Sequence, residues 1–125
     1  MSSTFLAAQV VEYGKPLVIA SLPKPTPTGS EVLVRLLVRP VNPADSLSIM
    51  GIYPGFRPAS LPAVPGLEGM GVVEAVGDKV TLVKTGQRVV PLNAPGTFQE
   101  YVIMAQEALL PLPDDVTDEA AAQVQ

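Results

Sequence analysis

The fold class of this chain follows from residues 31–41, which read Glu-Val-Leu-Val-Arg-Leu-Leu-Val-Arg-Pro-Val. Every even-numbered position from 32 to 38 is apolar, whereas the odd-numbered positions include two arginines, Arg35 and Arg39. Side chains of a strand point alternately to its two faces, so a period of two indicates a strand with one face buried. The stretch therefore predicts a half-buried strand of a sheet.

The rest of the chain favours more strands of the same kind. Its 14 prolines and 10 glycines are spread over all 125 residues. That distribution disfavours long helices and favours short strands joined by tight turns. The expected strands are residues 5–13, 16–22, 31–41, 71–77, 88–92, 97–105 and 108–112. Six or seven strands at this spacing predict a mainly β fold, a closed or partly open barrel.

Helix is expected in two short places only. Residues 45–50 follow Pro43 and stop at Gly51, which predicts a helix of about two turns. Residues 117–125 begin with a Thr and acidic residues and continue with alanines, so they open a second helix. We therefore expect one domain over residues 1–116 and, over 117–125, the start of a helix that leads to another domain.

Composition excludes several classes of function. The chain has no Cys and no His, so it cannot form a disulfide, a zinc finger or a Ser-His-Asp nucleophile. Its 8 basic and 12 acidic residues give a net charge of −4, which argues against a nucleic-acid partner. No apolar run is long enough for a membrane span, and no basic residue precedes Lys15 as a targeting signal would require. We expect a cytoplasmic protein without membrane or nucleic-acid partners.

Three segments carry a family resemblance. They are Val-Asn-Pro-Ala-Asp at 41–45, Gly-Ile-Tyr-Pro-Gly at 51–55 and Pro-Gly-Leu-Glu-Gly-Met-Gly-Val-Val at 65–73. Together with residues 85–89 and 96–101, and in this order, they resemble the N-terminal catalytic domain of the medium-chain dehydrogenase/reductase superfamily. The resemblance implies a GroES-like, partly open β-barrel with short helices, followed in the family by a Rossmann domain that is absent from this chain.

The resemblance also bears on zinc. Zinc-dependent alcohol dehydrogenases of the superfamily carry a Cys just before the Asp of the first motif and a His in the third. This chain has Asn42 and Pro43 near the first place and Leu67 at the second. Neither ligand is present, so we expect no metal. The chain resembles the zinc-free branch, which contains quinone oxidoreductases and 2-enoyl thioester reductases.

Within that branch, the position of Tyr53 is closer to the enoyl thioester reductases. The resemblance implies NADPH as hydride donor to the β-carbon of an enoyl thioester, with Tyr53 as the catalytic proton donor to the α-carbon or the thioester oxygen. It also assigns Asn42, near the nicotinamide, and Asp45 to the cofactor site, where Asp45 orients backbone at the short helix instead of acting as a base. A phenol is protonated at neutral pH and can donate to a developing enolate.

Two departures from the enoyl reductase pattern stand out. Phe98 replaces a Trp that often follows Gly-Thr in that group, and we expect it to alter the acyl or nicotinamide pocket. Gln87 replaces an Asp, which we expect to change only a turn. A structural interpretation of Tyr53, as a loop aromatic packed beside Pro54, stays open beside the catalytic one.

The glycines of the third motif invite a wrong interpretation. Gly66, Gly69 and Gly71 are spaced somewhat like a phosphate-binding loop. A dinucleotide fingerprint, however, lies between a strand and a helix, whereas this run leads into the expected strand at 71–77. Close packing of backbone explains the glycines better.

Two functional hypotheses follow. In the first, the chain is the catalytic domain of an NADPH-dependent oxidoreductase that reduces a quinone or an enoyl thioester, inactive without the nucleotide-binding domain; a homodimer of the full-length protein stays open. In the second, the chain is a stand-alone GroES-like binding or assembly module. Without a glycine-rich turn ahead of a helix, we expect no tight binding of NADPH by these residues alone.

Overall fold

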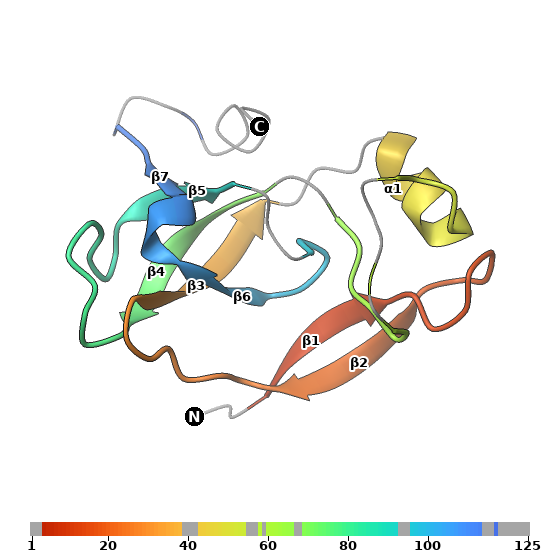
Figure 1. Ribbon diagram of the computed structural model, residues 1–125, viewed down its shortest axis with the longest axis horizontal. Helices are drawn as coiled ribbons and strands as arrows, with labels where there is room; N and C mark the ends of the chain where they lie inside the picture. Colours follow the sequence, from red (N-terminus) through yellow and green to blue (C-terminus); the bar gives the residue numbers. More distant parts are fainter. Residues whose placement is uncertain are drawn as a thin grey trace.

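The computed structural model describes residues 4–38, 43–54, 58, 60–66, 69–92, 96–113 and 117. Within these ranges the chain is mainly strand, with a single α-helix and a short 3₁₀ helix (Figure 1). The elements in chain order are β1 (Thr4–Gln9), β2 (Val18–Pro23), β3 (Glu31–Val38), α1 (Pro43–Met50), β4 (Met70–Val76), β5 (Arg88–Pro91), β6 (Tyr101–Ala105), η1 (Gln106–Ala108) and β7 (Leu109–Pro111).

The strands form two antiparallel sheets. One contains β1 and β2; the other has five strands in the order β6-β3-β4-β5-β7. β3 and β4 are neighbours in the larger sheet although more than thirty residues, 39–69, separate them in the chain. That insertion contains α1 and most of the family motifs. Figure 1 shows α1 at the opposite end of the molecule from β7 and η1.

Apolar side chains of the five-stranded sheet form the core. Three of the even positions of β3 are buried as predicted, Val32, Val34 and Leu36, in one cluster with side chains from β4, β5, β6 and β7, whereas Val38 at the end of the strand is half-buried. Leu33 departs from the alternation because it is buried as well. The pairing of β3 with β4 shifts register between Leu33 and Val34, and such an irregularity locally breaks the strict two-residue alternation.

The first two strands are shorter than predicted. β1 ends at Gln9 and β2 begins at Val18, so the connection between them covers residues 10–17 instead of residues 14 and 15. Val10 does not continue the pairing of β1 with β2, because its backbone pairs with Ala63. We call residues 10–17 the hairpin connection.

Close backbone packing of the third-motif glycines is confirmed. A Cβ placed on Gly71 would lie 2.8 Å from Val34 Cγ1 and 2.9 Å from the carbonyl carbon of Arg35, so β3 and β4 approach too closely for a side chain there. Gly66 has φ +113° and a Cβ on it would lie 2.7 Å from the backbone nitrogen of Thr97. Only glycine takes that backbone conformation without strain.

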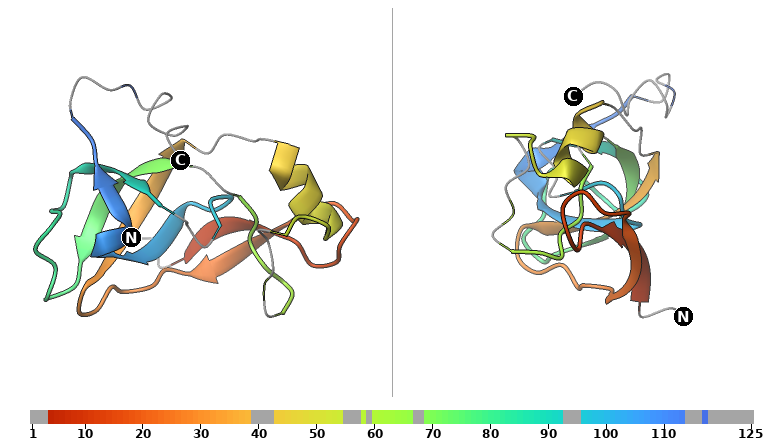
Figure 2. Two further views of the ribbon diagram at one scale, coloured as in Figure 1. Left: turned by 45° about the horizontal axis from the view of Figure 1, so that its top comes forward. Right: turned by 90° about the vertical axis from the view of Figure 1, so that its right-hand side faces the viewer.

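The mainly β, partly open barrel is confirmed. Seen from the α1 end, the strands curve round a common interior (Figure 2, right). No helix within the described ranges has the length and hydropathy that crossing a membrane requires. The second expected helix falls on residues 117–125, which apart from Thr117 lie outside the described residues, so the domain boundary at 116 stays a prediction.

Candidate active site

The helix α1 and the turn after it position the candidate proton donor. Gly51 has φ +81° and ends the helix. Its N–H donates to the carbonyl of Ser48 (3.1 Å), and the N–H of Ile52 donates to the carbonyl of Leu47 (3.0 Å). These two bonds form a Schellman motif, which satisfies the last carbonyls of a helix and redirects the chain. Tyr53 is the next residue.

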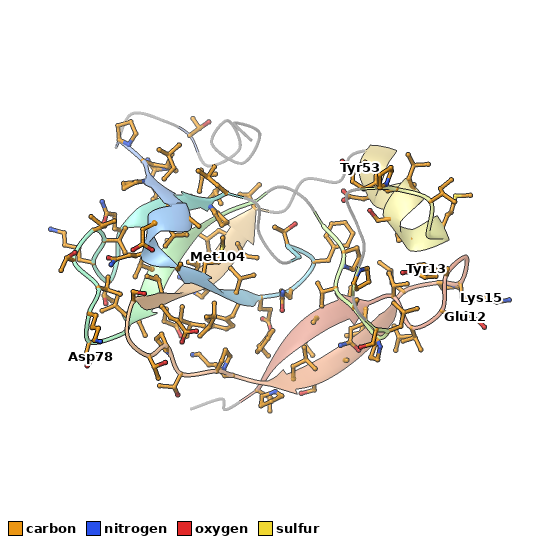
Figure 3. All side chains as sticks on the ribbon, viewed as in Figure 1. Glu12, Tyr13, Lys15, Tyr53, Asp78 and Met104 are labelled. Carbon is orange, nitrogen blue, oxygen red and sulfur yellow. The ribbon has the colours of Figure 1, made fainter. Side chains whose placement is uncertain are left out.

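Tyr53 follows this helix cap with its side chain half-buried. Figure 3 shows it beside α1, on the chain segment that returns along the helix. A half-buried phenol packs part of its surface against the protein and leaves the rest accessible to solvent or to a bound molecule. The location suits a group that must meet a substrate.

Asp45 lies on the inner face of α1. Its side chain is 1% exposed, and Ser48, three residues on and thus on the same face of the helix, is equally buried. Asp45 is also an acidic residue in the first turn, where it stabilises the positive end of the helix dipole. The face of α1 that carries Asp45 and Ser48 is therefore turned toward the interior of the protein. Asn42, the other predicted cofactor residue, lies outside the described residues.

The structure brings the third motif against residues 96–98. The N–H of Phe98 donates to the carbonyl of Pro65 (3.0 Å), and the N–H of Ala8 donates to the carbonyl of Phe98 (2.8 Å). Thr97 between them is fully buried, and among the described residues its Oγ1 has no hydrogen-bond partner. The segment with Phe98 thus joins β1 to the motif at 65–66.

Phe98 also lines a groove. The groove has a volume of about 540 Å³ and is formed by one end of β1, by Ile19 of β2 and by residues 98–100; its lining residues are Leu6, Ala7, Ala8, Ile19, Phe98, Gln99 and Glu100. Tyr53 and Asp45 are not among these residues. Phe98, where enoyl reductases often carry a Trp, therefore lines a surface that it shares with β1 and β2. The sequence motif alone did not indicate that these strands lie beside it.

Sequence reasoning did not find a charged cluster centred on Glu74. Lys24 forms an ion pair with Glu74 and lies 4.5 Å from the centroid of the Tyr101 ring. The hydroxyl of Tyr101 donates to Glu74 Oε1 (3.1 Å), and Arg35 Nε lies 3.8 Å from the same oxygen. The residues of this cluster have no regular spacing in the sequence. Only knowledge that β3 pairs with both β4 and β6 would have placed Arg35, Glu74 and Tyr101 together.

The cluster shifts two ionisation equilibria. Partial burial by itself would raise the pKa of Glu74, but hydrogen bonds from Lys24 and Tyr101 and the positive charges of Lys24 and Arg35 outweigh it and lower that pKa. The hydrogen bond to Glu74 is the largest of the influences that raise the pKa of Lys24, against a smaller opposing effect of desolvation. Both groups are therefore charged at neutral pH.

Comparison with known proteins identifies the family. Residues 28–114 match the alcohol dehydrogenase GroES-like domain. The chain is 45% identical over 95 residues to human mitochondrial enoyl-[acyl-carrier-protein] reductase, an alignment that covers 75% of this chain and 25% of that protein. The chain thus spans about a quarter of the length of this curated relative.

Solved structures agree with the sequence match. A putative NADPH:quinone reductase from Bacillus thuringiensis superposes with a TM-score of 0.87 at 39% identity, over 98% of this chain and 37% of that one. A mycobacterial protein complexed with NADPH superposes with a TM-score of 0.79 at 36% identity, over 94% of this chain and 35% of the other. The chain belongs to the alcohol dehydrogenase GroES-like domain family, as an N-terminal domain of the medium-chain dehydrogenase/reductase superfamily.

Proposed function

We propose that the protein to which this domain belongs reduces the activated double bond of an enoyl thioester and that Tyr53 supplies the proton. The observation that carries this proposal is the position of Tyr53, half-buried directly after the cap of α1. The 45% identity to an enoyl-[acyl-carrier-protein] reductase supports the substrate class. Reduction of a quinone is the second candidate, because the Bacillus thuringiensis relative is described as a quinone reductase.

The side chains assigned to the cofactor site suit the nicotinamide end of NADPH and not its phosphates. An amide at Asn42 can hydrogen-bond a neutral carboxamide. The carboxylate of Asp45, which would repel phosphate, is withdrawn from the surface. Asp45 then acts through the position of α1 and contacts no cofactor. When bound, NADPH would supply a hydride to the β-carbon of the substrate.

Tyr53 completes the reaction. Addition of hydride at the β-carbon places negative charge on the thioester oxygen and the α-carbon, and a donor that is already in place stabilises that charge as it develops. The phenol gives its proton to the α-carbon and recovers one from water. No other general acid and no metal ligand is required of this chain, so the proposed enzyme is zinc-free. A cytoplasmic location and a homodimer of the full-length protein stay predictions.

The experiment compares two substrates in the full-length protein. With NADPH, we expect reduction of crotonyl-CoA, and Tyr53→Phe should lower its kcat by about 100-fold or more, as loss of a general acid does. Reduction of benzoquinone should change little, because the reduced oxygens of a quinone take protons from water. Tyr101→Phe is the matched control, since Tyr101 lies on β6 and bonds Glu74.

Each outcome decides between the candidates. Equal crotonyl-CoA activity in Tyr53→Phe and the parent protein would remove Tyr53 from the mechanism. Activity on benzoquinone without activity on crotonyl-CoA would favour the quinone candidate. Inactivity on both, with either NADPH or NADH, would favour a binding or assembly module.

A further inference from the structure

The hairpin connection, residues 10–17, reaches the segment that carries Tyr53. At its start, Val10 and Ala63 exchange two backbone hydrogen bonds, of 2.7 and 3.0 Å. Four residues further along, the N–H of Gly14 donates to the carbonyl of Ile49 in α1 (3.0 Å). One short stretch, 10–14, is thus bonded to the chain both before and after Tyr53.

The ring of Tyr13 lies against the residue that ends α1. A Cβ placed on Gly51 would lie 2.7 Å from Tyr13 Cγ, 2.8 Å from Cδ1 and 3.1 Å from Cδ2. The ring therefore packs directly against Gly51, the residue that ends α1 with a positive φ. A side chain at position 51 would displace the ring. Figure 3 shows Tyr13 on the side of the connection that faces α1, whereas Glu12 and Lys15 point outward.

These contacts define both ends of the segment 51–63. Gly51 is held by the helix cap and lies against the Tyr13 ring, and Ala63 is paired with Val10. Tyr53 stands two residues beyond Gly51, so a movement of Gly51 relative to α1 moves the phenol with it. The hairpin connection thus contacts Gly51 through Tyr13 and Ala63 through Val10, residues much earlier in the chain.

We propose that Tyr13 is a positioning residue for Tyr53, acting through its contact with Gly51. The inference rests on the proposed function, because it assumes that the exact place of the Tyr53 hydroxyl matters for proton transfer. Misplacement of a reacting group by about 1 Å can cost about 100-fold in rate. A residue that holds the donor in place should affect turnover far more than substrate binding.

The first test uses single substitutions in the full-length protein, assayed with NADPH and crotonyl-CoA. Tyr13→Ala should lower kcat by roughly 10-fold to 100-fold with little change in KM. Tyr13→Phe should retain the activity, because ring carbons make the contact. Lys15→Ala, in the same connection with a side chain that points away from α1 (Figure 3), is the matched control and should resemble the parent protein. Parent-like kcat in Tyr13→Ala would overturn the inference.

The second test asks whether Tyr13 acts through Tyr53. In the Tyr53→Phe background, Tyr13→Ala should have less than about a 2-fold effect on kcat, since the group it positions is no longer a donor. Equal effects of Tyr13→Ala in both backgrounds would mean an independent, general structural role and would overturn the inference. A failure of the proposed function gives a different result: Tyr53→Phe alone then leaves the rate of crotonyl-CoA reduction unchanged. In that case the inference about Tyr13 fails as well.

A structural measurement covers the case of a poorly folded variant. Hydrogen exchange of the full-length protein, followed on a peptide spanning residues 47–54, reports the bonds donated by Gly51 and Ile52. Tyr13→Ala, or Tyr13→Leu if the alanine variant does not fold, should speed this exchange while peptides from β3 and β4 keep their protection. Unchanged exchange at 47–54 would contradict a role of Tyr13 in holding the segment.

Discussion

The five-stranded sheet and the α1 region are held together by different means. In the sheet, apolar side chains from all five strands share one cluster. In η1, which leads into β7, the buried residue Gln106 uses its side-chain amide oxygen to accept from the Thr81 and Leu82 N–H groups at 2.8 and 3.0 Å. In the α1 region, Asp45 and Ser48 are buried on one helix face, and backbone contacts at glycines join the segments.

The sheet core and the region around α1 differ in how strongly each depends on single contacts. A core of many equivalent apolar contacts is stable against small changes of position, because each contact is weak and replaceable. A segment held by a few backbone bonds and one ring has a defined position but little redundancy. Tyr53, the candidate proton donor, lies in such a segment, outside the apolar core of the sheet.

The largest expected effect tests the sheet. Leu36→Ala removes a side chain that is 4% exposed in the main cluster, and such truncations cost about 2–5 kcal/mol in the free energy of unfolding. Leu82→Ala, at a side chain that is 58% exposed, should stay within about 0.5 kcal/mol. Urea denaturation followed by circular dichroism measures both. Equal effects would contradict the assignment of the core.

A second substitution tests how closely the backbones of β3 and β4 approach. Gly71→Ala should lower the free energy of unfolding by about 1–3 kcal/mol, because the new methyl group would meet the Arg35 backbone as well as Val34 Cγ1. The backbone of a central strand cannot move aside without loss of pairing to its neighbours. A variant as stable as the parent protein would show that the two strands can separate there.

A third substitution tests the buried contact between residues 65–66 and residues 96–98. Thr97→Val keeps the shape of a fully buried side chain but removes a hydroxyl without a partner among the described residues. We expect a gain in stability of about 1 kcal/mol, since an unsatisfied buried group costs about 1–3 kcal/mol. Thr81→Val, at an exposed side chain, is the control. Destabilisation by Thr97→Val alone would mean that the hydroxyl is in fact bonded in solution.

The smallest effect concerns pH and the Glu74 cluster. Because the pKa of Glu74 is lower in the folded protein than its ordinary value of 4.5, its contribution to stability is present above that value and is lost as pH falls through the folded pKa. Between neutral pH and pH values below 4.5, the parent protein should therefore lose more stability than Glu74→Gln. Parallel curves for the two proteins would show that the cluster contributes nothing.

Much of the sheet could be predicted from local pattern. The alternation in residues 31–38 marked β3, and the glycines at 66 and 71 were recognised as sites of close packing because they led into a strand. The same approach extended the first strand to Tyr13. It failed there because apolar and turn-forming residues do not reveal that Val10 leaves its partner strand to pair with Ala63.

The candidate site was only partly accessible from sequence. Tyr53 and Asp45 were found through the family motifs, and their catalytic and cofactor roles stay proposals. The contact of Tyr13 with Gly51 and the cluster around Glu74 join residues far apart in the chain, with no spacing that a helix or strand would produce. The first contact depends on how the insertion between β3 and β4 folds back onto the hairpin connection, and the second on which strands become neighbours in the sheet.

The most direct test of the central claim is a crystal structure of the full-length protein with NADP⁺ and a saturated acyl thioester, the product of the proposed reaction. The account predicts the Tyr53 hydroxyl within hydrogen-bond reach, about 2.6–3.2 Å, of the thioester oxygen or pointing at the α-carbon. A Tyr53 hydroxyl turned away from the thioester, with another donor at that oxygen, would contradict it.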